Sequence, residues 1–293
     1  MIRSIVSSII RKHRWIPAFA CAAIATMFVA FGLVGIGRAT VVVLGFCFAA
    51  ACFVWGYSVS ASRGARWPML DHLHRRRYAE TWDTLASSPK QARAAACGEC
   101  EEGKVRLSAQ RPVSNITELA GIKITDDVLE IGCGVARIGL ELAPRCKQWT
   151  GVDISTNMLA CAAERLAGLN NVRLVHLSEA NLDAFSDNSF DLVYLTNMFD
   201  HLDEMDRYKY IMDGFRVLRP YGRLYVDNTD LESDAGWASF ANGVATVQNF
   251  ERPAYQPTPA TAAELTTYAK RAGFRETWAH HRSPLVILTA TKP

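Results

Sequence analysis

The sequence predicts an α/β fold with a doubly wound, mostly parallel, seven-stranded sheet whose last strand is antiparallel, preceded by two transmembrane helices. Three observations predict it. Strand-like and helix-like segments alternate over residues 114–293, a glycine bend follows an apolar run near residue 130, and residues 15–62 are almost free of charge. Such alternation is typical of sheets covered by helices on both faces. We therefore divide the chain into 1–65, 66–113 and 114–293.

The first part, residues 1–65, contains two uncharged runs. Residues 15–37 and 39–62 are 23 and 24 residues long, and only Arg38 separates them. A helix needs about 20 mainly apolar residues to cross a bilayer, and the alanines and glycines here allow two helices to pack closely in lipid. The pattern predicts a transmembrane hairpin with a short turn. A cleaved signal peptide and two buried helices of a soluble core are the alternatives.

Charge predicts the orientation of this hairpin. Residues 1–77 hold ten of the 32 Lys and Arg residues and one of the 29 acids, although the net charge of the whole chain is only +3. Basic residues flank both ends of the hairpin, which places both ends in the cytoplasm. We expect an integral protein of the inner or cell membrane, with membrane lipids as partners. Nucleic acid is not an expected partner, because the rest of the chain is acidic.

The second part, residues 66–113, is expected to form a juxtamembrane helix and a linker. Apolar residues recur at helical spacing over residues 69–96, which predicts one helix, and the mixed polar residues 97–112 predict a loop. Cys97 and Cys100 form a lone C-x-x-C pair, and we expect two reduced thiols rather than a metal site. No metal ligand is assigned.

The third part, residues 114–293, carries the predicted sheet. It begins with a short helix at 114–120. Its strands are expected near 127–131, 149–153, 172–177, 190–195, 222–227, 274–280 and 285–291. Too few residues separate the last two strands for a helical crossover, so they are expected to pair antiparallel.

The glycine bend has the sequence Glu-Ile-Gly-Cys-Gly-Val-Ala at residues 130–136, followed by a helix-like stretch at 136–143. Glycines at 132 and 134 let the backbone approach a ligand closely. Asp153 ends the next strand about 20 residues on, where an acid can hold ribose hydroxyls. Arg137 replaces the third glycine of dinucleotide motifs, and Glu130 would repel a diphosphate but suits an ammonium group. These features predict S-adenosylmethionine (SAM) as the cofactor.

Residues 128–292 resemble the class I SAM-dependent methyltransferases. The bend at 130–136 is similar to their first motif, residues 151–155 to the ribose motif and residues 178–180 to a motif whose acid accepts from the adenine amino group. Residues 188–195 are similar to the strand beside the reacting methyl, and residues 216–227 to the fifth strand with its preceding turn. The resemblance implies a Rossmann-like methyltransferase domain at 114–293, with residues 78–83 covering the cofactor or serving as a plain linker. The implied cofactor-binding residues are Glu130, Gly132, Cys133, Gly134, Asp153, Ile154, Glu179, Ala180 and Thr196.

Catalytic candidates follow the strand at 190–195, because ligands bind at the carboxyl ends of strands in such sheets. His201 could accept a proton from a hydroxyl, since histidine titrates near neutral pH, or it could pack the site. Asn197 and Asp200 could contact a substrate, although Asp200 also fits the cap of the next helix. Asp227 and Asn228 are further pocket candidates.

The carboxyl-terminal third contains an aromatic-rich segment at 231–258. It predicts either a lid over an apolar substrate or a packed crossover with a helix at 234–245. Residues 261–273 predict a scaffold helix that ends at a glycine.

Together these features predict a membrane-anchored methyltransferase that acts on a lipidic or amphiphilic small-molecule acceptor, because the anchor would hold the enzyme at the surface where such molecules reside. The alternatives are a soluble small-molecule or protein acceptor, and a SAM-binding scaffold or sensor without turnover. The acceptor atom and the oligomeric state are not predicted.

Overall fold

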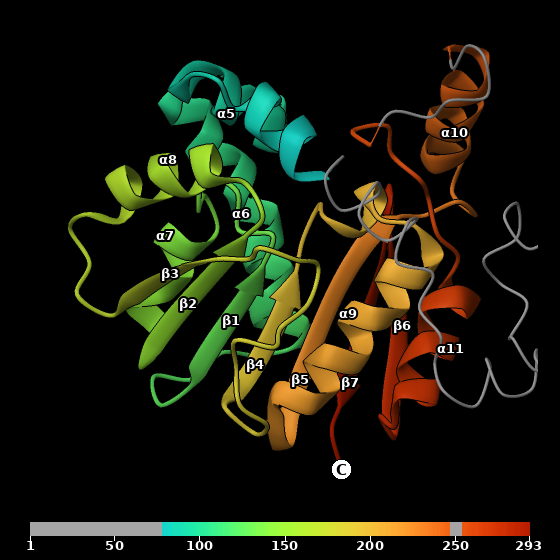
Figure 1. Ribbon diagram of the computed structural model, residues 1–293. Coiled ribbons are helices and arrows are strands. Elements are labelled where there is room, and N and C mark those ends of the chain that lie inside the picture. Colours follow the sequence, from blue (N-terminus) through green and yellow to red (C-terminus); the bar gives the residue numbers. More distant parts are fainter. Residues whose placement is uncertain (1–77, 247–253) are drawn as a thin grey trace, which may run out of the picture. The chain divides into compact units, whose positions relative to one another are not determined.

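The computed structural model describes residues 78–246 and 254–293, which form a seven-stranded sheet flanked by helices (Figure 1). The strand order is β3-β2-β1-β4-β5-β7-β6. Strands β1 to β5 pair in parallel, whereas β7 is antiparallel to both β5 and β6. The predicted sheet is therefore confirmed. Its strands are β1 (Asp127–Ile131), β2 (Gln148–Asp153), β3 (Val172–His176), β4 (Phe190–Leu195), β5 (Leu218–Thr229), β6 (Glu276–Arg282) and β7 (Leu285–Thr291).

The strand order places the site. The chain moves outward from β1 to β2 and β3, and then returns to the other side of β1 with β4. Crossovers therefore leave β1 and β4 toward opposite directions, and a crevice opens at their carboxyl ends. The antiparallel β7 follows from chain length, because only two residues separate Arg282 from Leu285 and a parallel return needs a dozen or more.

Alternate strand residues face two different helical layers. Leu129 and Ile131 of β1 belong to the apolar cluster that includes residues of α9 and α11, while Val128 belongs to the cluster with α6, α7 and α8. Figure 1 shows α9 and α11 in front of the sheet. These helices are α6 (Glu102–Leu119), α7 (Gly139–Leu142), α8 (Thr156–Leu166), α9 (Glu204–Val217) and α11 (Ala262–Ala272).

A buried tryptophan fixes the helical layer next to the glycine bend. Trp149 of β2 is fully buried, and a Cβ atom on either Gly139 or Gly151 would lie 2.3 Å from its indole. Only glycine therefore fits at these two positions. The indole Nε1 donates to the Tyr194 hydroxyl at 2.9 Å, so Trp149 also fixes β2 against β4.

The predicted helix at 69–96 is wrong in its described part, because the structure breaks it. Residues 78–85 are helical, and a second helix, α5 (Pro89–Cys97), starts after a turn. Ser88 caps α5 by accepting from the Gln91 amide, and Pro89 occupies its first position, where no amide hydrogen is needed. The apolar spacing alone did not reveal this cap.

The predicted loop at 97–112 is also wrong, because most of it belongs to α6, an 18-residue helix that runs through the proposed border at 113–114. Its polar residues form an exposed face, and Val105, Ala109 and Ile116 are fully buried at helical spacing. Pro112 inside the helix cannot donate to the Ser108 carbonyl. The Arg137 guanidinium donates to that carbonyl instead, at 2.9 Å.

The predicted helix at 136–143 begins later than expected. Ala136 has a φ of 54° and belongs to the bend. The short α7 starts at Gly139 and continues into a 3₁₀ turn, η1 (Ala143–Arg145). The helix at 234–245, which one of the two alternatives for residues 231–258 predicts, is present as α10 (Asp234–Thr246), but the packing expected with it is not, because only Gly236 and Gly243 are buried. The predicted helix at 261–273 is confirmed as α11, which Thr261 caps and Gly273 ends.

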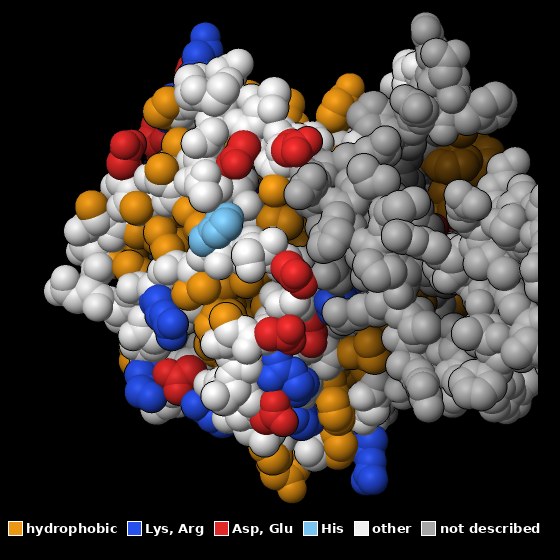
Figure 2. Space-filling view, in the orientation of Figure 1, with side chains coloured by type: hydrophobic (Ala, Val, Ile, Leu, Met, Phe, Trp, Pro, Cys, Tyr) orange, Lys and Arg blue, Asp and Glu red, His pale blue; other side chains and the backbone are white. Residues whose placement is uncertain are grey.

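Basic and acidic side chains are interspersed on the face of the domain that Figure 2 shows. Among the helices of residues 78–246 and 254–293, none has both the length and the apolar character needed to cross a bilayer. The predicted spans at 15–37 and 39–62 lie outside the described residues and stay a prediction.

Candidate active site

A cavity of about 320 Å³ lies at the carboxyl ends of β1, β2 and β4, where the strand order predicts a ligand site. Its volume is at the lower end of the range for small-molecule pockets. Glu130 lines it from β1 and Asp153 from β2, while Gly132 and Thr196 line it from the positions directly after β1 and β4. The other predicted residues that line it are Cys133, Gly134, Ile154, Ala180, Asn197, Asp200 and His201.

Glu179 is the exception among the predicted cofactor-binding residues. It is exposed and does not line the cavity, and its carboxylate accepts from the Asn181 side chain at 3.2 Å. The neighbouring Ala180 lines the cavity instead, and the contact of Glu179 with the adenine amino group stays a prediction.

The glycine bend has left-handed backbone conformations that exclude most side chains. Gly132 and Gly134 have φ values of 72° and 51°, and a Cβ on Gly132 would lie 2.7 Å from the Met198 side chain. The Gly132 and Cys133 amides donate to the Val152 carbonyl. The bend is therefore fastened to β2. Ala136 also has the left-handed conformation despite its Cβ.

Asp153 joins the bend to the loop after β2. Its carboxylate accepts from the Gly134 amide at 2.8 Å and from the Ser155 amide at 2.9 Å. Burial raises its pKa, and these amides oppose the rise. Each oxygen keeps a further lone pair for a donor such as a ribose hydroxyl. This position agrees with the predicted ribose-binding role.

Glu130 ends a buried hydrogen-bond chain that begins at Trp149. The Trp149 indole donates to Tyr194, and the Tyr194 hydroxyl donates to the Glu130 carboxylate at 2.6 Å. Burial raises the pKa of Glu130 to about 8, against the opposing effects of Tyr194 and Arg137. An ammonium group entering the cavity would favour the charged carboxylate, which agrees with a ligand that carries an amine.

We expect Glu130→Gln to stabilise the ligand-free protein more at pH 8 than at pH 5. The folded pKa of about 8 lies above the unfolded value of about 4.3. The folded state therefore holds the extra proton in this range, and the cost of burying Glu130 grows as pH rises toward 8. Thermal unfolding at the two pH values measures the difference, with the exposed Glu118→Gln as control. An equal shift of Tm at both pH values would contradict this reasoning.

The residues after β4 are held by two buried acids. Asp227 accepts from the Asn197 amide at 2.9 Å, and burial raises its pKa to about 7. Asp200 accepts from the amide and hydroxyl of Thr229. The predicted cap role of Asp200 is wrong, because Asp203 caps α9. Asp227 holds the residues after β4, and Asp200 joins them to the end of β5. Asp200 also lines the cavity.

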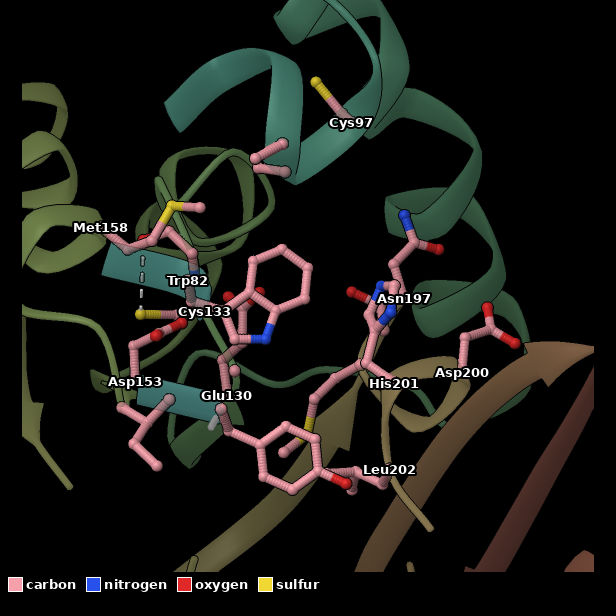
Figure 3. Close-up of a pocket in the computed structure, with 18 of the residues that line it drawn as sticks. Trp82, Cys97, Glu130, Cys133, Asp153, Met158, Asn197, Asp200, His201 and Leu202 are labelled. Carbon is pink, nitrogen blue, oxygen red and sulfur yellow. Dashed lines mark hydrogen bonds between the residues drawn. The ribbon is translucent and has the colours of Figure 1, made fainter. Parts of the chain in front are cut away.

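His201 lies in a 3₁₀ turn, η2 (Phe199–His201), and its ring meets the Trp82 indole edge to face at 4.8 Å between centroids. Figure 3 shows the Trp82 indole between Glu130 and His201. The histidine therefore packs against the cover of the cavity and also faces its interior. This geometry accommodates both of its predicted roles.

Residues 78–85 and α5 cover the cavity, through Tyr78, Trp82 and Cys97. Asp83 holds this cover closed, since its carboxylate accepts from the Ser155 hydroxyl at 2.7 Å and from the Asn157 amide at 3.2 Å. Of the two roles predicted for residues 78–83, the structure favours the cover.

Several lining residues were not predicted. Arg137 and Pro257 line the cavity, and nothing in the local sequence indicates either one. Trp82 stands four residues after Tyr78, and this aromatic pair was a usable signal. Asn228 is buried but does not line the cavity. Cys97 and Cys100 are free thiols.

Known proteins resemble this chain in part. A family model described as a methyltransferase domain matches residues 128–222. A demethylmenaquinone methyltransferase of Listeria welshimeri is 34% identical over 121 residues, which are 40% of this chain and 50% of the relative. Phosphoethanolamine N-methyltransferase 1 of Arabidopsis thaliana is 25% identical over 128 residues, 43% of this chain and 26% of the relative. The matched residues thus cover 50% of the length of the first relative and 26% of the second.

A solved structure supports the fold. A SAM-dependent methyltransferase of Thermotoga maritima, described as a possible histamine N-methyltransferase, is 21% identical with a TM-score of 0.51. The match covers 64% of this chain and 91% of the other. The strand order, the bend between Glu130 and Asp153 and the family match agree with one another. Residues 128–222 therefore match a methyltransferase domain, and the described residues have the Rossmann-like fold of a SAM-dependent methyltransferase.

Proposed function

We propose that this protein transfers a methyl group from SAM to a lipidic or amphiphilic small molecule at a membrane. The observation that carries the proposal is the mixed lining of the cavity. Glu130, Asp153 and the glycine bend suit the cofactor, and Trp82, Leu202 and Pro257 add apolar surface beside the polar Asn197, Asp200 and His201. An apolar acceptor loses water favourably on entering such a space.

The chemistry needs little beyond positioning. A sulfonium is an activated methyl donor, so the enzyme must hold the acceptor atom in line with the methyl group and exclude water. The cover formed by residues 78–85 and α5 excludes water. His201 is the candidate base where the acceptor atom carries a proton.

Membrane attachment is part of the proposal. The uncharged runs at 15–37 and 39–62 support a hairpin in the inner or cell membrane, with the catalytic domain in the cytoplasm, where SAM is made available. The similarity to a protein named demethylmenaquinone methyltransferase supports an apolar acceptor. The similarity to a phosphoethanolamine N-methyltransferase favours a soluble acceptor as the second candidate.

We expect membranes that contain the protein to transfer label from methyl-labelled SAM into an organic-extractable product. Mass spectrometry of the lipid extract should show a species heavier by one CH₂ group, absent from membranes with the Asp153→Ala variant. Label in protein or in the aqueous fraction would favour the alternative acceptors. Binding of SAM without label in any fraction would contradict turnover and favour a sensor.

A further inference from the structure

Helix α10 is almost entirely exposed, although it is rich in apolar residues. Within Asp234–Thr246 only Gly236 and Gly243 are buried. Trp237, Phe240 and Val244 are 58%, 38% and 65% exposed. Their spacing of three and four residues puts these three side chains on one stripe. Asp234, at the first position, is the only charged residue of the helix.

This composition does not suit contact with water. Helices shorter than about 12–15 residues are marginal in water without packing, and an exposed helix normally has a charged face. None of the 12 residues that follow Asp234 in α10 is charged, and ten of them are exposed. An apolar surrounding would therefore stabilise α10 better than water does.

The base of α10 is firmly held. Ser233 caps the helix by accepting from the Gly236 amide at 3.0 Å, and the Leu231 amide donates to the Ala260 carbonyl at 3.0 Å. A Cβ on Gly236 would lie 1.8 Å from the Asp230 carbonyl oxygen, so the helix starts in close contact with the end of β5. The segment between Leu231 and Ala260 thus begins and ends at hydrogen-bonded residues, and the start of α10 has a fixed position beside β5.

The same segment borders the cavity. Pro257 lines it, and the Thr258 amide donates to the Asp200 carbonyl at 2.7 Å. Tyr78 also lines the cavity, and it stands 16 residues after Ser62, the end of the second uncharged run.

We infer that α10 lies in the interface of a lipid bilayer, between headgroups and acyl chains, and that a membrane-borne acceptor reaches the cavity from this interface without crossing water. This inference rests on the proposed function. The stripe is narrow and contains a Trp and a Phe side chain, which favour membrane interfaces.

A protein partner fits this stripe less well. Aromatic side chains have about 150–250 Å² of surface, so the three partly exposed side chains offer on the order of 300 Å². A stable protein interface needs about 800 Å² on each partner. Insertion into a bilayer has no such minimum, because every apolar group that leaves water contributes.

The test is photocrosslinking of the full chain reconstituted in vesicles of phosphatidylcholine and phosphatidylglycerol. A p-benzoylphenylalanine replaces Trp237 or Phe240. One control position is Trp278, an exposed tryptophan on the edge strand β6. The other is Ile124, an exposed residue before β1, near the ends of the parallel strands that lie away from the cavity. We expect at least fivefold more lipid adduct at 237 and 240 than at 278 and 124.

Equal lipid labelling at all four positions would overturn the inference, as would adducts at 237 and 240 with protein alone. The adduct forms without turnover, so it reports on α10 even if no acceptor is ever methylated. Conversely, methyl transfer to a lipid without an adduct at α10 would leave the proposed function intact and end this inference. Trp237→Ser combined with Phe240→Ser should lower methylation of a membrane-borne acceptor severalfold and leave the Kd for SAM unchanged.

Discussion

We expect Asp153→Ala to raise the Kd for SAM by about 100-fold or more. Hydrogen bonds to a charged group contribute about 1.5–3 kcal/mol each, two ribose hydroxyls can donate to this carboxylate, and each 1.4 kcal/mol is a factor of ten in affinity. The substitution also releases the Gly134 and Ser155 amides, which Asp153 now accepts from, so the bend loses its fixed position. Isothermal titration calorimetry on the purified full chain measures this Kd.

Asp126→Ala is the matched control. Asp126 is 4% exposed and pairs with Arg223, but it precedes β1 at the edge of the sheet opposite the cavity. Its loss should lower Tm and leave the Kd for SAM unchanged. If Asp153→Ala binds SAM as tightly as the wild type, the ribose assignment is wrong.

Arg207→Met should lower the free energy of unfolding by about 3–5 kcal/mol, as expected when one partner of a buried ion pair is removed. Arg207 is 1% exposed. Its guanidinium donates to the Phe199 carbonyl, the Thr258 carbonyl and the Glu264 carboxylate. It thereby joins α9 to the turn that contains His201 and to α11. Urea unfolding measures the loss, which should appear with an unchanged m-value.

Arg219→Met provides the comparison. Arg219 makes ion pairs with Asp127 and Asp191, but its side chain is 36% exposed, and pairs on the surface contribute about 0–1 kcal/mol. If Arg207→Met lowers the free energy of unfolding no more than Arg219→Met does, the buried contacts of Arg207 do not stabilise this region.

The sheet was predictable because its signals are local. Apolar runs gave every strand within a few residues, and β5 alone extends well before its predicted start, to Leu218. The bend was predictable for the same reason, since Gly132 and Gly134 stand directly after an apolar run. Asp153 follows from the chain length of one βαβ unit.

The helices before the sheet were less predictable, because their boundaries depend on caps and long-range packing. The polar residues of α6 are typical of a loop, and only contact with the sheet shows which of its residues are buried. Asp200 and Asp203 are equally good caps by residue type. The turn at η2 selects Asp203 and leaves Asp200 free to accept from Thr229.

By itself, the sequence determined the order of the strands along the chain, the bend and its two acids, and hence the cofactor, because short-range backbone preferences and fixed spacings control these features. The tertiary structure alone decided how the site is closed and supported. Arg137 donates to the Ser108 carbonyl, which Pro112 leaves without a donor, Trp149 requires glycine at positions 139 and 151, and Asp83 fastens the cover. The contacts of Arg137 and Asp83 join residues far apart in the chain, so their partners exist only after the layers have packed.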